Sequence, residues 1–245
     1  MGSKICRIPD VLSIGRDQYG VFDDFVSFTD TQLWTVANVG AGTTLAHEGS
    51  VGRSTLKFFT TTAANDSAIL ATTNEIFKFK ANKAIFAESR IIFTDVNTDD
   101  GFVGFGFADA IAATTMADTT GAITATDACL IYKLPNTTVW AFHTEINGSV
   151  TGLGSATIGS VSDTTAGGAS FQTLRIEIVP RSSTVFEARP YVDGVQLKTS
   201  AGTPIMHTIT LGTATDLDFG LIHKTGHTDD FTMYCDYIFA AQVRD

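Results

Sequence analysis

Apolar and polar residues alternate with a period of two along much of this chain. In residues 174–178, Leu174, Ile176 and Ile178 are apolar, and the residues between them, Arg175 and Glu177, are charged. Such alternation predicts β-strands that have one face against a core and the other against water. No window places apolar residues at i, i+3, i+4 and i+7 over three turns. We therefore expect almost no helix.

A succession of apolar runs, separated by turn residues, predicts the strands. The runs are 56–60, 68–72, 84–93, 101–109, 128–133, 138–146, 171–179, 185–192, 217–223 and 230–243. In the last run the alternation predicts that the odd-numbered positions from Phe231 to Val243 share the core face. Asp193-Gly194 predicts a two-residue hairpin, because a type I′ turn needs positive φ at both central positions.

The segments between the runs are rich in Gly, Thr, Ala and Ser, and none resembles a linker. The longest, 110–126 and 147–169, are expected to be surface loops or weak edge strands, or else contacts with a neighbouring copy. We predict one antiparallel β-sandwich over residues 22–245, preceded by an extended N-terminal arm at residues 1–21. Pro9, Gly15 and Gly20 interrupt any period within that arm.

Length and charge narrow the functional classes. A chain of 245 residues buries enough apolar surface to fold without disulfides or a structural metal. Its net charge of −10 opposes binding to the phosphate backbone, so we expect no nucleic-acid partner. No apolar run approaches 18 residues and the first residues lack an apolar signal segment, so we expect no membrane partner and no secretion.

The three cysteines, Cys6, Cys129 and Cys235, are an odd number at wide spacing. They fit neither a disulfide framework nor a zinc site. Cys129 and Cys235 lie within apolar strand patterns, where we expect buried thiols, as in a protein assembled in a reducing cytosol.

No catalytic set is apparent in the sequence. Sandwich glycosidases place an acid and a nucleophile on one strand in a Glu-x-Asp-x-x-Glu pattern, which is absent here. Asp216, Asp218 and Glu187 stand apart from such a pattern and are expected on outward strand faces or in loops. There is also no Gly-x-Ser-x-Gly elbow and no phosphate-binding glycine loop. We predict no catalytic residues and no enzymatic activity, with a divergent glycosidase or lyase as the alternative to test.

Two segments resemble metal sites, and we expect neither to bind a metal. His223 and His227 are four apart and precede two aspartates, but a hairpin turn around Gly226 would not bring the imidazoles together. The segment 95–101 offers oxygens at alternate positions, as a calcium loop does. Its glycine comes one position late, however, and Gly106 stands where a bidentate Glu belongs. No metal and no other cofactor is predicted.

Trp34 and Trp140 are open to two interpretations. Large aromatic residues within strands are usually part of the core. The alternative is a platform on which a sugar ring stacks.

The order of motifs resembles a known family. FDDFVSFTDTQLWTV precedes AIFAESRIIFTDVNTDDGFVGFGFAD, and LRIEIV, RPYVDGVQL and CDYIFAAQV follow. Over about residues 22–243 this is similar to the concanavalin A-like (laminin G-like) jelly-roll sandwiches, particularly those of tailed-bacteriophage virion proteins. The resemblance implies a jelly-roll fold and a non-enzymatic structural role as a capsid decoration, or cement, protein.

Such a role would place the chain on the outer capsid surface of a virion, after synthesis in the host cytoplasm. The resemblance implies a homotrimer that clamps neighbouring major capsid subunits and stabilises the head. An arm of this length extends to about 60–70 Å, enough to reach a neighbouring subunit. The alternative function is a carbohydrate- or receptor-binding module of a phage tail or head fibre.

Overall fold

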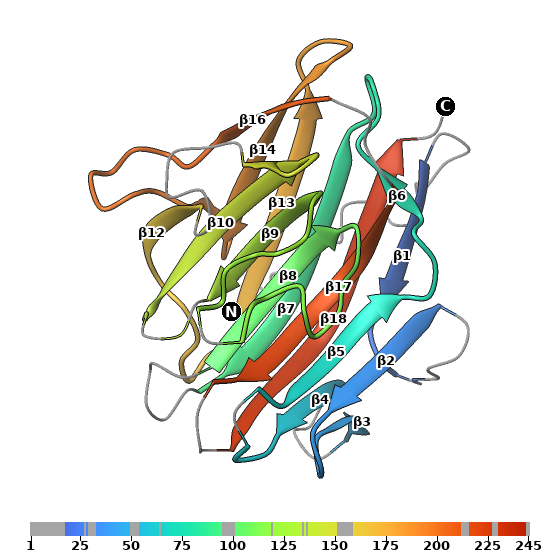
Figure 1. The fold of residues 1–245 in the computed structure, drawn as a ribbon, viewed down its shortest axis with the longest axis vertical. Coiled ribbons are helices and arrows are strands. Elements are labelled where there is room, and N and C mark those ends of the chain that lie inside the picture. The colour runs from blue at the N-terminus through green and yellow to red at the C-terminus, as the bar shows by residue number, and fades with distance from the viewer. Residues whose placement is uncertain are drawn as a thin grey trace, which may run out of the picture.

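Two antiparallel sheets packed face to face form the structure, a computed structural model (Figure 1). It describes residues 18–26, 28, 33–49, 54–63, 65–94, 101–118, 120–133, 135, 137–150, 159–211, 216–226 and 230–243. Eighteen strands and no helix occur in these ranges, which confirms the predicted all-β sandwich. Accordingly, the described residues contain no helix that is long and apolar enough to span a bilayer.

The first sheet, called sheet A, has the strand order β15-β14-β13-β7-β18-β4-β3. In addition, β1 pairs with β18, and β16 pairs with β14. The bounds are β1 Gln18–Asp23, β3 Thr44–Glu48, β4 Thr55–Thr60, β7 Ile85–Phe93, β13 Gln172–Pro180, β14 Val185–Val192, β15 Val195–Gln196, β16 His207–Thr210 and β18 Phe231–Val243.

The second sheet, called sheet B, has the order β11-β10-β9-β8-β17-β5-β2. Here β12 pairs with β10, and β6 pairs with β17. The bounds are β2 Trp34–Val39, β5 Ser67–Thr72, β6 Phe77–Lys78, β8 Gly101–Ala108, β9 Ala128–Lys133, β10 Val139–Ile146, β11 Ser149–Val150, β12 Ser160–Thr165 and β17 Asp216–Thr225.

Every predicted apolar run corresponds to a strand of this structure: β4, β5, β7, β8, β9, β10, β13, β14, β17 and β18. The Asp193-Gly194 hairpin is also confirmed, with φ of 51° and 79° at its central residues and Val192 paired with Val195. Within the long segment 147–169, β11 and β12 are short strands that pair with β10.

The predicted alternation along β18 is wrong after Cys235. A β-bulge inserts Asp236 opposite the β7 ladder, so that Cys235 pairs with Ile91 and Tyr237 with Arg90. The phase of the strand therefore shifts by one residue, and Ile238 enters the core in place of Tyr237. The bulge also divides the strand's other neighbours, because residues before it pair with β4 and residues after it pair with β1.

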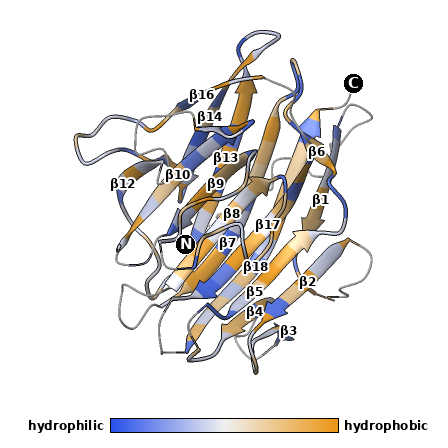
Figure 2. Cartoon of the chain, in the orientation of Figure 1, coloured by the Kyte–Doolittle hydropathy of each residue, from blue (hydrophilic) through white to orange (hydrophobic). Residues whose placement is uncertain are grey.

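A continuous apolar core fills the space between the sheets, and Figure 2 shows the central strands predominantly in the hydrophobic colour. Trp34 and Trp140 are both buried in it, which confirms the core interpretation and excludes them as an exposed sugar platform. Cys129 and Cys235 are buried free thiols, as predicted.

The outer face of sheet B is largely covered. Residues 109–127, here called the strap, cross this face with an apolar cluster beneath them (Figure 1, green). Lys224 Nζ fixes the strap by donating to the carbonyl oxygens of Ala113, at 3.2 Å, and Met116, at 3.1 Å, and by pairing with Asp118. The strap therefore belongs to the packed structure of the protein.

Most of the predicted arm, residues 1–17, lies outside the described residues, as does Cys6. Residues 18–21, assigned to the end of the arm, form the start of β1 and pair with β18. The division into arm and sandwich stays a prediction.

Candidate functional site

The acidic residues singled out in the sequence do not meet. Asp216 and Asp218 lie on β17 of sheet B, whereas Glu187 lies on β14 of sheet A. Glu187 is held between two arginines, and its pKa is lowered chiefly by the hydrogen bond from Arg181. The pKa of Asp218 is raised chiefly by burial, and its carboxylate accepts the Ile111 N–H at 3.4 Å, where the strap begins.

Residues 95–100 of the calcium-like segment and residues 227–229 of the histidine segment lie outside the described residues. His223 is buried in the core between Phe58 and Phe231, whereas Asp230 is exposed, so these two side chains do not converge. Among the described residues no group of three or more His, Cys, Asp or Glu side chains is placed to hold a metal.

A serine–histidine pair that the sequence did not reveal lies inside the sandwich. Ser160 Oγ is 2.8 Å from His207 Nε2, and Thr144 Oγ1 is 2.9 Å from His207 Nδ1. A nucleophile beside a base has this geometry, but all three side chains are buried. Burial lowers the pKa of His207 to about 4. The trio ties β16 of sheet A to β10 and β12 of sheet B, and a substrate has no access to it.

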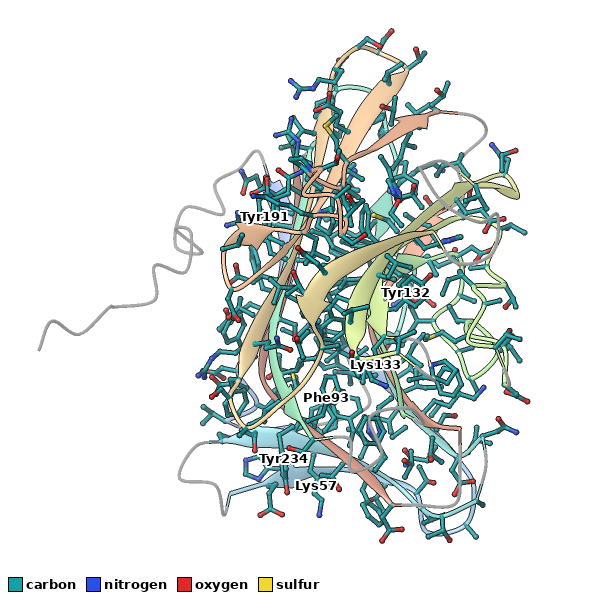
Figure 3. The ribbon with its side chains drawn as sticks, turned by 90° about the vertical axis from the view of Figure 1, so that its left-hand side faces the viewer. Lys57, Phe93, Tyr132, Lys133, Tyr191 and Tyr234 are labelled. Carbon is teal, nitrogen blue, oxygen red and sulfur yellow. The ribbon has the colours of Figure 1, made fainter. Side chains whose placement is uncertain are left out.

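The outer face of sheet A is the more open of the two faces and carries aromatic and charged side chains. Tyr191 and Tyr234 project from this side in Figure 3, opposite Tyr132 of sheet B. Arg175 stacks on Tyr191, with its guanidinium carbon 4.3 Å from the ring centroid. Glu88 accepts a hydrogen bond of 2.6 Å from the Tyr237 hydroxyl. Most charges of this face are therefore paired or stacked.

A depression of about 270 Å³ interrupts this face and is here called the aromatic cleft. Its lining residues are Ile92, Phe93, Thr94, Phe171, Thr232 and Tyr234. Three neighbouring strands build it. Tyr234 of β18 pairs with Ile92 of β7, and Phe171 immediately precedes the first residue of β13, which pairs with Ile91.

The alternation of these strands explains why the cleft has aromatic walls. Ile91 and Phe93 face the core, so Ile92 between them faces outward and forms the floor. Likewise Met233 and Cys235 are in the core, which leaves Tyr234 on the outer face. Two strand spacings, about 10 Å, separate the backbones that carry the two aromatic walls.

Arg90 holds one wall in place. Its guanidinium carbon lies 4.4 Å from the centroid of the Phe171 ring, and its Nη1 pairs with Asp236, the bulge residue. A β-bulge of this kind re-aims a side chain, here toward Arg90. The cleft thus combines an apolar floor, two aromatic walls, threonine hydroxyls at one end and a paired charge at the other.

Sequence reasoning missed this cleft because each of its residues is ordinary for a strand. The apolar run 84–93 predicts a strand, but the sequence does not distinguish Ile92 from Phe86, which also faces outward. Phe171 and Tyr234 are separated by more than sixty positions, and their proximity depends on β7 lying between β13 and β18.

The chain was compared with known proteins. No protein-family model matches it, and no curated protein matches its sequence. Among solved structures, the carbohydrate recognition domain of Emp47p aligns with a TM-score of 0.59 and 10% identity, over 93% of this chain and 96% of that one. An endo-1,3-beta-glucanase from Streptomyces sioyaensis aligns with a TM-score of 0.54 and 14% identity, over 94% and 98%. Peanut lectin aligns with a TM-score of 0.52 and 9% identity, over 93% and 98%.

At these identities the likeness establishes the fold. The chain is an antiparallel, concanavalin A-like jelly-roll sandwich, and the predicted fold class is confirmed. Because lectin domains and a glucanase share this architecture, function has to be argued from the site.

Proposed function

We propose that this chain is a non-enzymatic saccharide-binding module whose site is the aromatic cleft. The observation that carries the proposal is the pairing of two aromatic walls, Phe171 and Tyr234, across the apolar floor of Ile92 on the outer face of sheet A. Small-ligand sites are typically concave and apolar, with a few placed polar groups that fix orientation.

The chemistry of a pyranose ring matches this arrangement. One face of such a ring presents C–H groups, which pack on aromatic rings and on Ile92, while its edges carry hydroxyls. Thr94, Thr232 and the Tyr234 hydroxyl supply hydrogen-bonding groups at the cleft. The Arg90–Asp236 pair fixes the wall and leaves no net charge at that end, which suits a neutral ligand.

Two observations support the absence of catalysis. Asp236 is engaged in an ion pair with Arg90, the residue that holds the Phe171 wall. The Ser160–His207 pair is buried and inaccessible. The fold neighbours are compatible with saccharide binding, since they include a carbohydrate recognition domain and peanut lectin, and the glucanase keeps the enzymatic alternative open to test.

The test is binding of the purified chain to a glycan array, repeated with Tyr234→Ala. Loss of an aromatic anchor is expected to weaken binding at least tenfold, about 1.4 kcal/mol. Tyr191→Ala is the matched control, because it removes the same phenol from the same face but outside the cleft. Absence of any saturable glycan binding refutes the proposal, as does equal binding by Tyr234→Ala and the control. Turnover of a bound polysaccharide would refute the non-enzymatic part.

A second candidate is a virion structural protein of the capsid-decoration type, acting as a homotrimer that clamps major capsid subunits. The observation in its favour is that β1 pairs with β18 along its full length, so a segment preceding Gln18 would be anchored to a rigid strand. A clamp needs such an anchor to transmit force. This proposal predicts that a chain beginning at Gln18 folds normally and no longer binds capsid shells. Shell binding by the truncated chain that equals that of the full chain refutes it.

A further inference from the structure

We propose that the aromatic cleft and a second pocket beside it are two subsites of one groove, which binds a chain of sugar residues rather than a single ring. The inference rests on the proposed saccharide-binding function and adds a second site and a ligand class to it.

The second pocket has a volume of about 280 Å³, close to that of the cleft. It is lined by Thr94, Lys133, Thr138, Thr165, Ala166, Gly167 and Gly168. Thr94, which follows the last residue of β7, lines both depressions, so they adjoin at this residue. The groove therefore passes from the outer face of sheet A to the end of the sandwich, where Figure 3 places Phe93 and Lys133 between the sheets.

A set of hydrogen bonds holds the two subsites in a fixed relation. The Gly168 N–H donates to the Phe93 carbonyl at 2.9 Å, and the Gly167 N–H donates to Gln172 Oε1 at 2.8 Å. The same Oε1 accepts from the indole of Trp140 at 3.3 Å. Gln172 directly follows Phe171, one wall of the cleft. The turn that lines the second pocket is thus bonded to Gln172, beside the Phe171 wall, and to Phe93, beside the floor residue Ile92.

The second pocket keeps its depth because its turn has no side chains to fill it. Gly167 and Gly168 have φ of 75° and 128°, which side-chain-bearing residues rarely adopt. A Cβ on Gly167 would lie 2.5 Å from the Phe93 ring, so the backbone packs directly on that ring. Glycine is therefore required there for the turn to lie so close to the core.

The two subsites offer different chemistry. The cleft supplies aromatic surface for stacking, whereas the second pocket has no aromatic lining residue and is formed by small side chains, glycine backbone and Lys133. Each depression is slightly smaller than the roughly 300 Å³ at which pockets for drug-sized ligands begin. One depression accommodates about one or two sugar rings, so a longer chain is needed to occupy both.

The experiment measures affinity against chain length by calorimetry. The probes are gluco-, manno-, galacto- and N-acetylglucosamine oligosaccharides of one to six residues. For the series that binds, affinity is expected to rise at least tenfold between the disaccharide and the tetrasaccharide and then to level off, because the second subsite adds contacts without a second loss of translational freedom.

Thr138→Trp fills the second pocket from an exposed position. It is expected to abolish the gain with chain length while keeping the affinity for monosaccharides and disaccharides. Thr210→Trp, the same change at an exposed position on β16, is the matched control, and unchanged melting temperatures establish folding.

Affinity that is independent of chain length overturns the inference and leaves the proposed function standing. A gain that persists in Thr138→Trp overturns it as well. Failure of every series to bind the wild-type chain overturns the proposed function and this inference together.

Discussion

Acidification is expected to destabilise this fold, and the buried His223 is expected to account for a large part of the loss. Its ring stacks on Phe231, with centroids 4.2 Å apart, and meets the edge of Phe58 at 6.3 Å. Neither ring nitrogen has a hydrogen-bond partner among the described residues. Complete burial lowers the pKa of His223 from 6.5 to about 3, because a charged imidazole would be desolvated there.

The direction of the effect follows from the depressed pKa. Between pH 6.5 and 3 the unfolded chain binds a proton at this histidine and the folded chain does not, so the free energy of unfolding falls as the pH falls. Each pH unit below 6.5 costs about 1.4 kcal/mol. At pH 4.5 the loss from His223 alone is about 2.7 kcal/mol relative to pH 8. His207, with a pKa of about 4, adds a loss of similar size.

The perturbation that isolates His223 is His223→Phe, which keeps an aromatic ring in the Phe58–Phe231 stack and removes the titration. Urea unfolding at pH 8, 6.5, 5.5 and 4.5 is followed by the fluorescence of the buried Trp34 and Trp140. The variant is expected to lose about 2.7 kcal/mol less than the wild type between pH 8 and 4.5.

His223→Leu serves as a second variant, because it also lacks a titratable group. Its absolute stability differs with packing, but its pH dependence should equal that of His223→Phe. If both variants lose as much stability as the wild type on acidification, His223 is not desolvated as described and the reasoning fails.

Three further predictions concern other parts of the fold. Lys224→Met removes the anchor of the strap and is expected to lower the free energy of unfolding by about 1.5–3 kcal/mol. It should also accelerate hydrogen exchange in residues 109–127, and unchanged exchange there would contradict the anchoring role. Gly194→Ala should lower the free energy of unfolding measured in urea by about 1 kcal/mol. A Cβ at this position meets nothing within 4 Å, so the cost comes from the φ of 79°, which strains any residue with a side chain. Equal stability would argue against the type I′ turn. Burial raises the pKa values of Cys129 and Cys235, so both thiols should react with a thiol reagent at pH 8 only after unfolding. Peptide mapping is the measurement, and a label on either cysteine in the native protein would show that this cysteine is exposed.

The long strands could be predicted from the sequence because each presents an apolar face that the chain must bury. The run 171–179 is the clearest case. Its alternation fixes which face of the strand is buried, because only one of the two faces carries Leu174, Ile176 and Ile178. The Asp193-Gly194 turn was equally predictable, because few residue pairs adopt two successive positive φ angles.

Short strands and the site were beyond the same reasoning. β12 and β16 are rich in Ser and Thr, and their pairing with longer neighbours makes them strands, which the residue types alone do not indicate. The aromatic cleft needs Phe171 and Tyr234 on adjoining parts of one face, a fact of sheet order. His207 was hidden for a related reason, because its partners Thr144 and Ser160 come from the opposite sheet.

The bulge at Asp236 has a consequence for changes in chain length. Deleting one residue elsewhere in the middle of β18 would turn every following side chain to the opposite face, exposing Ile238 and burying Tyr237. Deleting Asp236 itself would leave each remaining side chain on its present face, because Asp236 is the supernumerary residue of the ladder. Deletion at this position therefore keeps the core-facing side chains of β18 in the core. It would remove the ion-pair partner of Arg90 and the bulge beside the cleft. Asp236 is a point at which the shape of the binding face can be altered independently of the interior.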